Sequence, residues 1–423
     1  MAEKETPYSV VRLDASHSAE ILDLAQSAYA FDDVDWDPSY MFDAFEWERT
    51  EGVWVPDPIS KEARLVGMGV VFSRRIKVPG GDIPVGAVSW GAVHPDARRG
   101  GILRALIDFY LDEVRSSGKE AITALFASEG SIYGRFGFGL ATRSAALRLS
   151  PGAALRQVAG AENIKLKSTK LDETIHEKGI NQCRETNRLR PGSISAESHQ
   201  SRELFYDPAR HRIDAEAKRI VIACDKEGLT DPWLGYAVFR RSRADGRDRA
   251  IVYVEEIVAA DAPTARTLWN WLLNLDLVDE IRTGARPTDD PLLILLENAR
   301  EAPVQISDGL YIRIIDVAKA LSARTYACDV NVTISVRDEL RPHWGGAWRL
   351  TAQAGREASC MDAKDSTPDL SCEVRELGSA YLGGTTWTAM VVAGLVQEHR
   401  AGAAAELDKA FHTNLAPHHG VTF

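Results

Sequence analysis

Apolar residues in the first 150 positions recur at spacings that alternate between those of helices and those of strands. From Ala19 to Ala30 they fall on one side of a predicted amphipathic helix. Apolar runs at Leu65–Phe72 and Ile83–Val93 predict two strands, joined by a turn at Val78–Gly81 that contains Pro and two Gly residues. A third strand is predicted at Ile122–Phe126. The order indicates a mixed α/β domain.

The clearest helix lies between the last two of these strands. Leu103, Leu106, Ile107, Tyr110, Leu111 and Val114 repeat every three or four residues, which places them on one face. Gly100 and Gly101 precede the helix, and Gly118 is placed to end it.

A second α/β run follows a stretch of weaker pattern, Pro151 to about Leu171, which we expect to join two domains. Trp233–Arg240 and Ala250–Val258 resemble strands, and Thr264–Leu275 has the period of a helix. This strand–loop–helix order repeats the order around Val93 and predicts an internal repeat of the first domain.

The pattern changes again from about Asp308. Strands are predicted at Ile312–Ile315, Cys328–Val336 and Trp348–Gln353, and a closing helix at Ala404–Phe411. The third region therefore has an α+β character.

The length of 423 residues is too great for one ordinary hydrophobic core. We predict three consecutive domains, residues 1–150, 151–303 and 304–423, of which the first two are α/β and the last is α+β. Hydrophobic residues make up 45% of the chain and charged residues 26%, which is typical of globular proteins.

Charge and cysteine content narrow the functional classes. A formal net charge of −11 argues against nucleic acid as a partner. It suits a cationic substrate, and it suits equally a protein that is acidic for solubility. Five scattered cysteines indicate neither a disulfide framework nor a metal site. Without a signal-like amino terminus or a long apolar run, we expect a cytoplasmic enzyme that does not span a membrane, and secretion without a signal peptide stays open.

The segment Val93–Arg104 carries the strongest chemical signal. A strand ends, a turn with two arginines and two glycines follows, and a helix begins at once. Backbone N–H groups at such a helix start favour a diphosphate, and Gly100 and Gly101 let the main chain approach it closely. Arg98, Arg99 and Arg104 offer donors to phosphate oxygens. A plain strand-to-helix connection with solvated arginines is the alternative.

A second signal follows the strand Ile122–Phe126. In Ala127–Gly139, four glycines alternate with aromatic residues around Tyr133. Taken by itself, a tyrosine in such a turn is better explained by packing than by a site.

Together these segments resemble a known family. Arg98-x-x-Gly101-x-Leu103 is similar to the pyrophosphate loop of GCN5-related N-acetyltransferases, with Leu103 where that loop has a small residue. The combination with Ala127–Gly139 resembles the enhanced intracellular survival (Eis) family. The likeness extends to residues 235–238, 307–314 and 377–384 and to the terminal Phe423.

The resemblance implies tandem GCN5-related acetyltransferase folds followed by a sterol-carrier-protein-like domain, assembled as a homohexamer. It implies transfer of acetyl from acetyl-CoA to primary amines of aminoglycosides, with Tyr133 as general acid and the C-terminal carboxylate of Phe423 as general base. Thr422 replaces an acidic residue that is frequent in the family. No metal is implied. The residues implied to bind acetyl-CoA are Gly91, Ala92, Val93, Arg99, Gly100, Gly101, Ile102, Leu103, Arg104, Ser128 and Glu129.

Aromatic and acidic residues are the candidates for the acceptor pocket, because carboxylates attract ammonium groups and rings support cations. They are Trp90, Phe31, Asp32, Asp33, Asp35 and Trp36. The aspartates alone could equally be a solvated loop. In the middle domain, residues 259–264 lack the glycines and arginines of a phosphate loop, so we expect that copy to act as scaffold.

Two other functions stay open. One is acetylation of protein or peptide lysines through the same site. The other is a non-catalytic carrier of coenzyme A or lipid, based on the last domain; an intact phosphate loop and Tyr133 argue against it.

Overall fold

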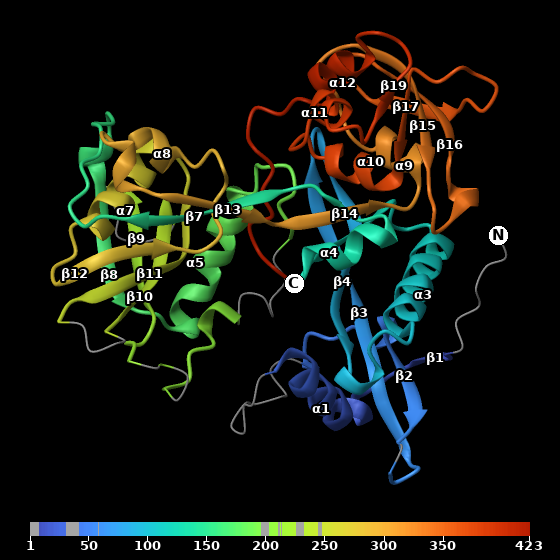
Figure 1. Cartoon of the computed structure of the whole chain (residues 1–423). Coiled ribbons are helices and arrows are strands. Elements are labelled where there is room, and N and C mark those ends of the chain that lie inside the picture. Colours follow the sequence, from blue (N-terminus) through green and yellow to red (C-terminus); the bar gives the residue numbers. More distant parts are fainter. Residues whose placement is uncertain are drawn as a thin grey trace. The chain divides into compact units, whose positions relative to one another are not determined.

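The computed structural model describes residues 8–30, 42–57, 59–195, 203–209, 212, 214–225, 232–243 and 248–423. They form two compact units that are each discontinuous in sequence (Figure 1). The first unit contains Met1–Ala141, Leu310–Thr413 and Phe423. The second contains Thr142–Gly309 and Asn414–Thr422, whereas the sequence predicted three consecutive segments.

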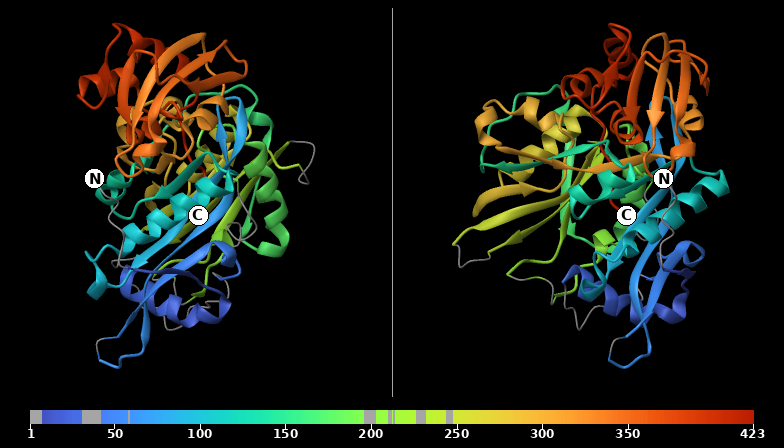
Figure 2. Two further views of the ribbon diagram at one scale, coloured as in Figure 1. Left: turned by 90° about the vertical axis from the view of Figure 1, so that its right-hand side faces the viewer. Right: turned by 45° about the vertical axis from the view of Figure 1, so that its right-hand side comes forward.

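A seven-stranded sheet forms the centre of the first unit, in the order β1-β2-β3-β4-β5-β14-β6. Its longest pair, β3 and β4, is the blue antiparallel ribbon of Figure 2. Gly80 lies between them with a φ of 81°, a conformation that favours glycine, so the predicted turn is confirmed. The strands are β1 (Val10–Arg12), β2 (Thr50–Pro56), β3 (Ala63–Val78), β4 (Gly81–Val93), β5 (Ile122–Phe126), β6 (Gly139–Leu140) and β14 (Leu310–Ile314).

Two amphipathic helices pack against this sheet. α1 (Ser18–Tyr29) buries Ile21 and Leu24. α3 (Ile102–Ser117) buries the predicted apolar face except Leu103, which is partly exposed. Gly118 ends α3 in the left-handed conformation, with a φ of 61°, as predicted. A short helix, α4 (Gly130–Tyr133), and the 3₁₀ turn η4 (Gly134–Phe136) follow β5.

Strand β14 joins the first sheet from far along the chain. It pairs antiparallel with β5 on one side and with β6 on the other. The predicted strand Ile312–Ile315 therefore exists, but it belongs to the first sheet and not to the fold that follows it.

The remaining part of the first unit is a five-stranded sheet with four helices, in the strand order β17-β16-β15-β18-β19. Its fully buried aromatic residues include Trp387, Tyr381 and Tyr326. The elements are α9 (Val317–Ser322), β15 (Val330–Arg337), η9 (Pro342–Trp344), β16 (Gly346–Ala352), β17 (Ala358–Asp362), β18 (Leu370–Glu373), α10 (Val374–Ala380), α11 (Trp387–Val392), β19 (Gln397–Glu398) and α12 (Ala403–Phe411).

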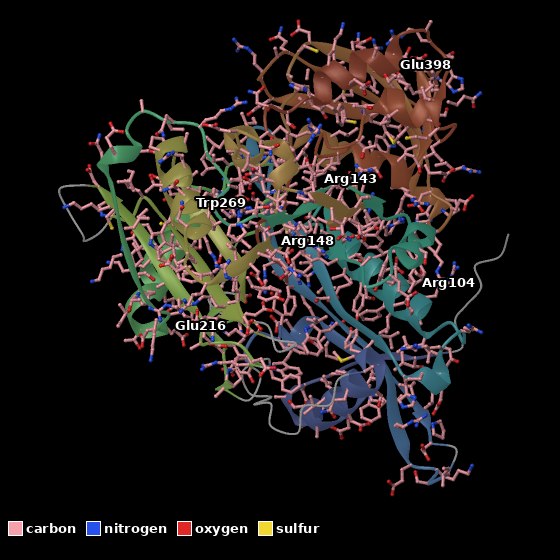
Figure 3. The ribbon with its side chains drawn as sticks, turned by 60° about the vertical axis from the view of Figure 1, so that its left-hand side comes forward. Arg104, Arg143, Arg148, Glu216, Trp269 and Glu398 are labelled. Atoms are coloured by element: carbon pink, nitrogen blue, oxygen red, sulfur yellow. The ribbon has the colours of Figure 1, made fainter. Side chains whose placement is uncertain are left out.

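The second unit has its own seven-stranded sheet, in the order β13-β7-β12-β11-β10-β9-β8. Trp269, labelled in Figure 3, is buried in its core. The elements are β7 (Arg143–Leu149), β8 (Ile164–Lys170), α5 (Glu173–Thr186), β9 (Arg219–Asp225), β10 (Gly235–Ser242), β11 (Ala250–Ala259), α7 (Ala262–Leu273), β12 (Val278–Thr283), α8 (Pro291–Leu295) and β13 (Val304–Asp308).

The predicted repeat is confirmed at the level of topology. In each unit an antiparallel pair, β3–β4 or β10–β11, is followed by a helix and then by a parallel strand, β5 or β12. The predicted linker from Pro151 to Leu171 is wrong, because β8 within it pairs with β9 along its whole length.

Candidate active site

A β-bulge near the end of β4 shapes the candidate site. Met68 pairs with Ala92 and Val70 with Ser89, so Trp90 and Gly91 both lie opposite the single residue between Met68 and Val70. Trp90 has a φ of 56°, which is uncommon for a bulky residue. Such strained backbone often marks functional positions.

Strand β4 also diverges from β5. Their parallel pairing lies at Gly86–Thr123 and Ala87–Ala124, and the rest of β4, as far as Val93, continues past it. A pocket occupies the space beside the unpaired part. Its lining is Tyr29, Met68, Val88, Ser89, Trp90, Gly91, Leu103, Leu106, Ile107, Tyr110, Leu125, Phe126, Ser128, Tyr133 and Phe423.

Tyr133 presents its hydroxyl to this pocket from the end of α4. The ring is buried, and a Cβ added to Gly91 would stand 3.3 Å from the Tyr133 Oη. Glycine at position 91 therefore keeps space open beside the hydroxyl. Burial raises the pKa of Tyr133, so the phenol stays protonated at neutral pH.

Phe423, the last residue of the sequence, lies in the same pocket. Its ring centroid is 5.0 Å from that of Phe126. The Ser89 Oγ donates a hydrogen bond of 3.0 Å to a main-chain oxygen of Phe423. We did not predict Ser89 as a site residue. The sequence feature that could have indicated it is a polar serine within the otherwise apolar run of β4.

Tyr29 is a second pocket residue that the sequence did not suggest. It ends α1, and its ring lies 6.5 Å from that of Trp90 in an edge-on arrangement. Burial raises the pKa of Tyr29, and the nearby Tyr133 adds to the shift. Trp90 also packs edge-on against Phe45 at 5.3 Å. The predicted acceptor residues Phe31, Asp32, Asp33, Asp35 and Trp36 lie outside the described residues.

The loop between β4 and α3 has the features of an anion site. Gly101 is the N-cap of α3, with a φ of 97° and no side-chain cap, and nothing lies within 4 Å of where its Cβ would be. The N–H groups of the first turn can therefore face a ligand. Arg99 is exposed with a φ of 65°, and Arg98 instead donates to the Ala28 carbonyl at 3.1 Å. This open, cationic helix start fits the diphosphate of a coenzyme.

The other residues assigned to the coenzyme differ in their surroundings. Gly91, Leu103 and Ser128 line the pocket. Ile102 is the first residue of α3 and its side chain is buried, so it can offer only main-chain groups. Ala92 and Val93 pair with β3, and Gly100 lies next to Tyr8. Arg104 is half-exposed on α3 (Figure 3), and Glu129 is the N-cap of α4.

Across the described ranges, no group of three or more His, Cys, Asp or Glu side chains is arranged to hold a metal ion. Each helix that the structure describes is too short or too polar to cross a bilayer. All five cysteines are described, and each is a free thiol.

Family profiles match three parts of the chain. Residues 10–141 match an acetyltransferase (GNAT) domain, and residues 199–314 match a second acetyltransferase (GNAT) domain. Residues 317–420 match a sterol carrier protein domain. The predicted fold class is confirmed, and the GNAT matches imply the use of acetyl-CoA.

Similar proteins cover nearly the whole chain. An uncharacterized N-acetyltransferase of Streptomyces avermitilis is 33% identical over 382 residues, 88% of each chain. N-acetyltransferase Eis of Mycobacterium tuberculosis is 31% identical over 381 residues, 86% of this chain and 87% of its own. The crystal structure of Eis1 from Mycobacterium abscessus superposes with a TM-score of 0.80 at 30% identity, covering 98% of this chain and all of the other. The chain therefore belongs to the Eis family of GCN5-related N-acetyltransferases.

Proposed function

We propose that this N-acetyltransferase moves acetyl from acetyl-CoA to a primary amine of a polycationic small molecule such as an aminoglycoside. The observation that carries the proposal is the meeting of two groups in one pocket. The Tyr133 hydroxyl is a proton donor, and the Phe423 main-chain terminus is an acceptor, held by Ser89. The net charge of −11 suits a cationic acceptor.

The helix start at α3 would hold the coenzyme. Main-chain N–H groups after Gly101, with Arg99 and Arg104, offer donors to the diphosphate, and Gly91 and Ser128 would border the pantetheine arm. When bound, acetyl-CoA supplies a thioester carbonyl, whose carbon forms a bond to the amine nitrogen while its bond to sulfur breaks.

Tyr133 would supply the proton that the departing sulfur needs. Because burial raises its pKa, the Oη carries its proton at neutral pH and would have it available to donate as negative charge develops on the sulfur. The absence of a side chain at Gly91 would leave room for the sulfur beside this hydroxyl.

The carboxylate of Phe423 would take the opposite role. A chain-terminal carboxylate has an ordinary pKa of about 3.3–3.7, so it is ionised at neutral pH but is a weak base. It would orient the ammonium group and accept the proton that the amine loses, directly or through water. Ser89 would fix the direction of this terminus. Trp90 and Tyr29 would form the aromatic wall against which the acceptor rests.

Release of free thiol from acetyl-CoA, measured with an aminoglycoside, a polyamine and a lysine peptide, tests the proposal. Fast turnover with the lysine peptide alone would assign a protein acceptor instead. Absence of turnover with every amine would contradict the enzymatic assignment. Size-exclusion chromatography with light scattering tests the homohexamer that we also propose.

Changes at the chain terminus test the mechanism. Deleting Phe423, or adding one glycine after it, should lower kcat by about 10²-fold or more, because either change moves the carboxylate. Phe423→Leu is the matched control: it keeps the carboxylate and should retain kcat within about tenfold. Tyr133→Phe should also lose about 10²-fold. Full turnover by a folded deletion variant would contradict the role of Phe423, and intact mass of the protein verifies where the chain ends.

A further inference from the structure

The segment that follows β15 contacts α3 through one arginine. The Arg341 Nη1 donates to Asp108 Oδ1 at 3.0 Å. Its Nε and Nη2 donate to the two carboxylate oxygens of Asp112, at 3.1 and 2.9 Å. The Arg341 side chain is only 10% exposed and Asp108 is 21% exposed, whereas Asp112 is 58% exposed, so the contact with Asp108 is the better shielded of these charge-assisted contacts. A single guanidinium from beyond the acetyltransferase region thus spans two carboxylates on successive turns of α3.

Asp108 is shared between this arginine and the candidate coenzyme site. Its other oxygen, Oδ2, lies 3.6 Å from the Nε of Arg104. Arg104 is in the first turn of α3 and half-exposed, where it can reach either Asp108 or a phosphate at the helix start. Burial raises the pKa of Asp108, while Arg341 and Arg104 oppose the shift. The carboxylate of Asp108 would therefore compete with a diphosphate at the helix start for Arg104.

The segment that carries Arg341 is itself held firmly. Asp338 Oδ1 accepts hydrogen bonds from the main-chain N–H groups of Leu340 and Arg341, at 3.0 and 2.9 Å. Asp338 Oδ2 accepts a bond of 2.6 Å from Arg313 Nη2, and Arg313 Nη1 donates to the Phe136 carbonyl at 2.6 Å. Arg313 is fully buried. The connection therefore runs from the turn that follows Tyr133 to the middle of α3.

Trp344 completes this anchor. Its ring lies beneath the guanidinium groups of Arg341, Arg313 and Arg115, at 5.7, 5.9 and 5.6 Å from the ring centroid. Arg115, also on α3, donates to the Ile315 carbonyl at 2.7 Å. These contacts fix the position of Arg341 relative to α3 without help from a ligand.

We propose that Arg341 is a positioning residue for the coenzyme: by neutralising Asp108 and Asp112, it weakens the hold of Asp108 on Arg104, so that Arg104 can exchange this 3.6 Å contact for one with the diphosphate. The proposal rests on the donor site proposed above. Without Arg341, two carboxylates remain within about 10–17 Å along the helix of its N-terminus, judged by a rise of 1.5 Å per residue. Arg104 becomes the nearest cation for Asp108, and the uncompensated negative charge repels a phosphate.

The experiment is titration calorimetry of the full-length protein with coenzyme A. Arg341→Gln should weaken coenzyme A binding about tenfold. Arg337→Gln is the matched control, because Arg337 comes from the same region but is 71% exposed and pairs with Glu373 and Glu339 away from α3. Its dissociation constant should stay within about twofold of that of the unmodified protein.

Two double variants separate charge from a purely structural role. Asp108→Asn in the Arg341→Gln background should bring binding back to within about threefold of the unmodified protein. In an Arg104→Gln background, Arg341→Gln should weaken binding by only about twofold, because the loss of Arg104 no longer contributes and only the direct repulsion between the carboxylates and the phosphate remains. The KM for acetyl-pantetheine, which lacks the diphosphate, should not change in Arg341→Gln.

The outcomes distinguish this inference from the proposed function. If the unmodified protein binds coenzyme A and Arg341→Gln binds it equally well, the role of Arg341 is wrong and the donor site stands. The same conclusion follows if Asp108→Asn fails to restore binding while the melting temperature of each variant shows a folded protein. If the unmodified protein does not bind coenzyme A, the donor site itself is wrong.

Discussion

The same strand–loop–helix motif occurs in both units of the chain, but the start of the helix differs between the two copies. In the first unit, α3 begins at Gly101 with no side chain capping its N–H groups. In the second, α7 begins at Asp261, whose carboxylate accepts a hydrogen bond of 2.9 Å from the Thr264 N–H. Pro263 removes a further donor from that first turn. The N–H groups at the start of α3 remain available to a ligand, whereas at the start of α7 the Asp261 side chain accepts one of these hydrogen bonds.

The spaces beside the central strands differ in the same sense. Beside β4 the first unit has the pocket that contains Tyr133 and Phe423. Beside β11 the second unit has the Arg286 guanidinium, which donates to the Ile257 carbonyl at 3.0 Å and to Asp290 at 2.8 Å. Asp290 is almost fully buried. The first unit, with its open pocket and uncapped α3, is expected to be less stable than the second, whose corresponding groups are hydrogen-bonded. The difference between the two copies therefore indicates which features serve binding and which serve folding.

The largest predicted contrast concerns pH. In the second unit, His418 and His419 are buried and stacked at 4.6 Å. Burial lowers the pKa of His418 to about 2, with His419 adding to the shift, and lowers the pKa of His419 to about 4. The unfolded chain binds these protons near pH 6.5, so the stabilisation is complete above that pH and is lost as the pH falls. At pH 5 the loss should be about 2 kcal/mol per histidine.

The first unit should respond in the opposite direction. Burial raises the pKa of the fully buried Glu51 to about 7, although Arg12 opposes the shift. The folded state holds this proton more tightly than the unfolded one, so stability is lost as the pH rises from about 4.5 to 7. Hydrogen exchange at pH 5 and 7.5, corrected for intrinsic rates, should show β9 and β10 less protected at pH 5, and β2 and β3 less protected at pH 7.5. Glu51→Gln should remove only the second effect. Equal responses in both units would contradict the contrast.

A pair of glycine variants separates binding from backbone strain. Gly101 and Gly402 are both helix N-caps with positive φ, 97° and 88°, and both have open space at the Cβ position. Alanine at either position should cost about 1–2 kcal/mol of unfolding free energy, because the left-handed conformation disfavours a Cβ. Only Gly101→Ala should also weaken coenzyme A binding, by about tenfold. Equal binding by the two variants, measured by calorimetry, would rule out the α3 start as the phosphate site.

The smallest predicted effect belongs to the capped helix. Asp261→Ala removes the N-cap of α7 and should lower the unfolding free energy by about 1 kcal/mol, measured by denaturant titration. Coenzyme A binding should not change, because that helix start has no role in binding. A weaker affinity for coenzyme A in this variant would show that the second copy contributes to the donor site.

Much of this architecture could be predicted from local pattern. The 3.6-residue period and Gly118 defined α3, and the turn at Gly80 defined the β3–β4 ribbon, because periodicity and turn residues act over a few neighbours. The candidate phosphate loop could be recognised for the same reason: its glycines and arginines are adjacent in sequence. The missed strand β8 was also visible, since Ile164 and Leu166 alternate with lysines, but the run was too polar to stand out.

The active-site partners could not be predicted in this way. Ser89 and Phe423 are 334 positions apart, and only family resemblance indicated Phe423. Arg341 reaches Asp108 across 233 positions. No local period records which distant strand or loop will pack against a given helix, because such contacts depend on the whole chain being folded. The candidate phosphate loop before α3 consists of residues adjacent in sequence, so the sequence alone determined it. The groups that line the pocket, such as Tyr133 and Phe423, come together only through long-range packing.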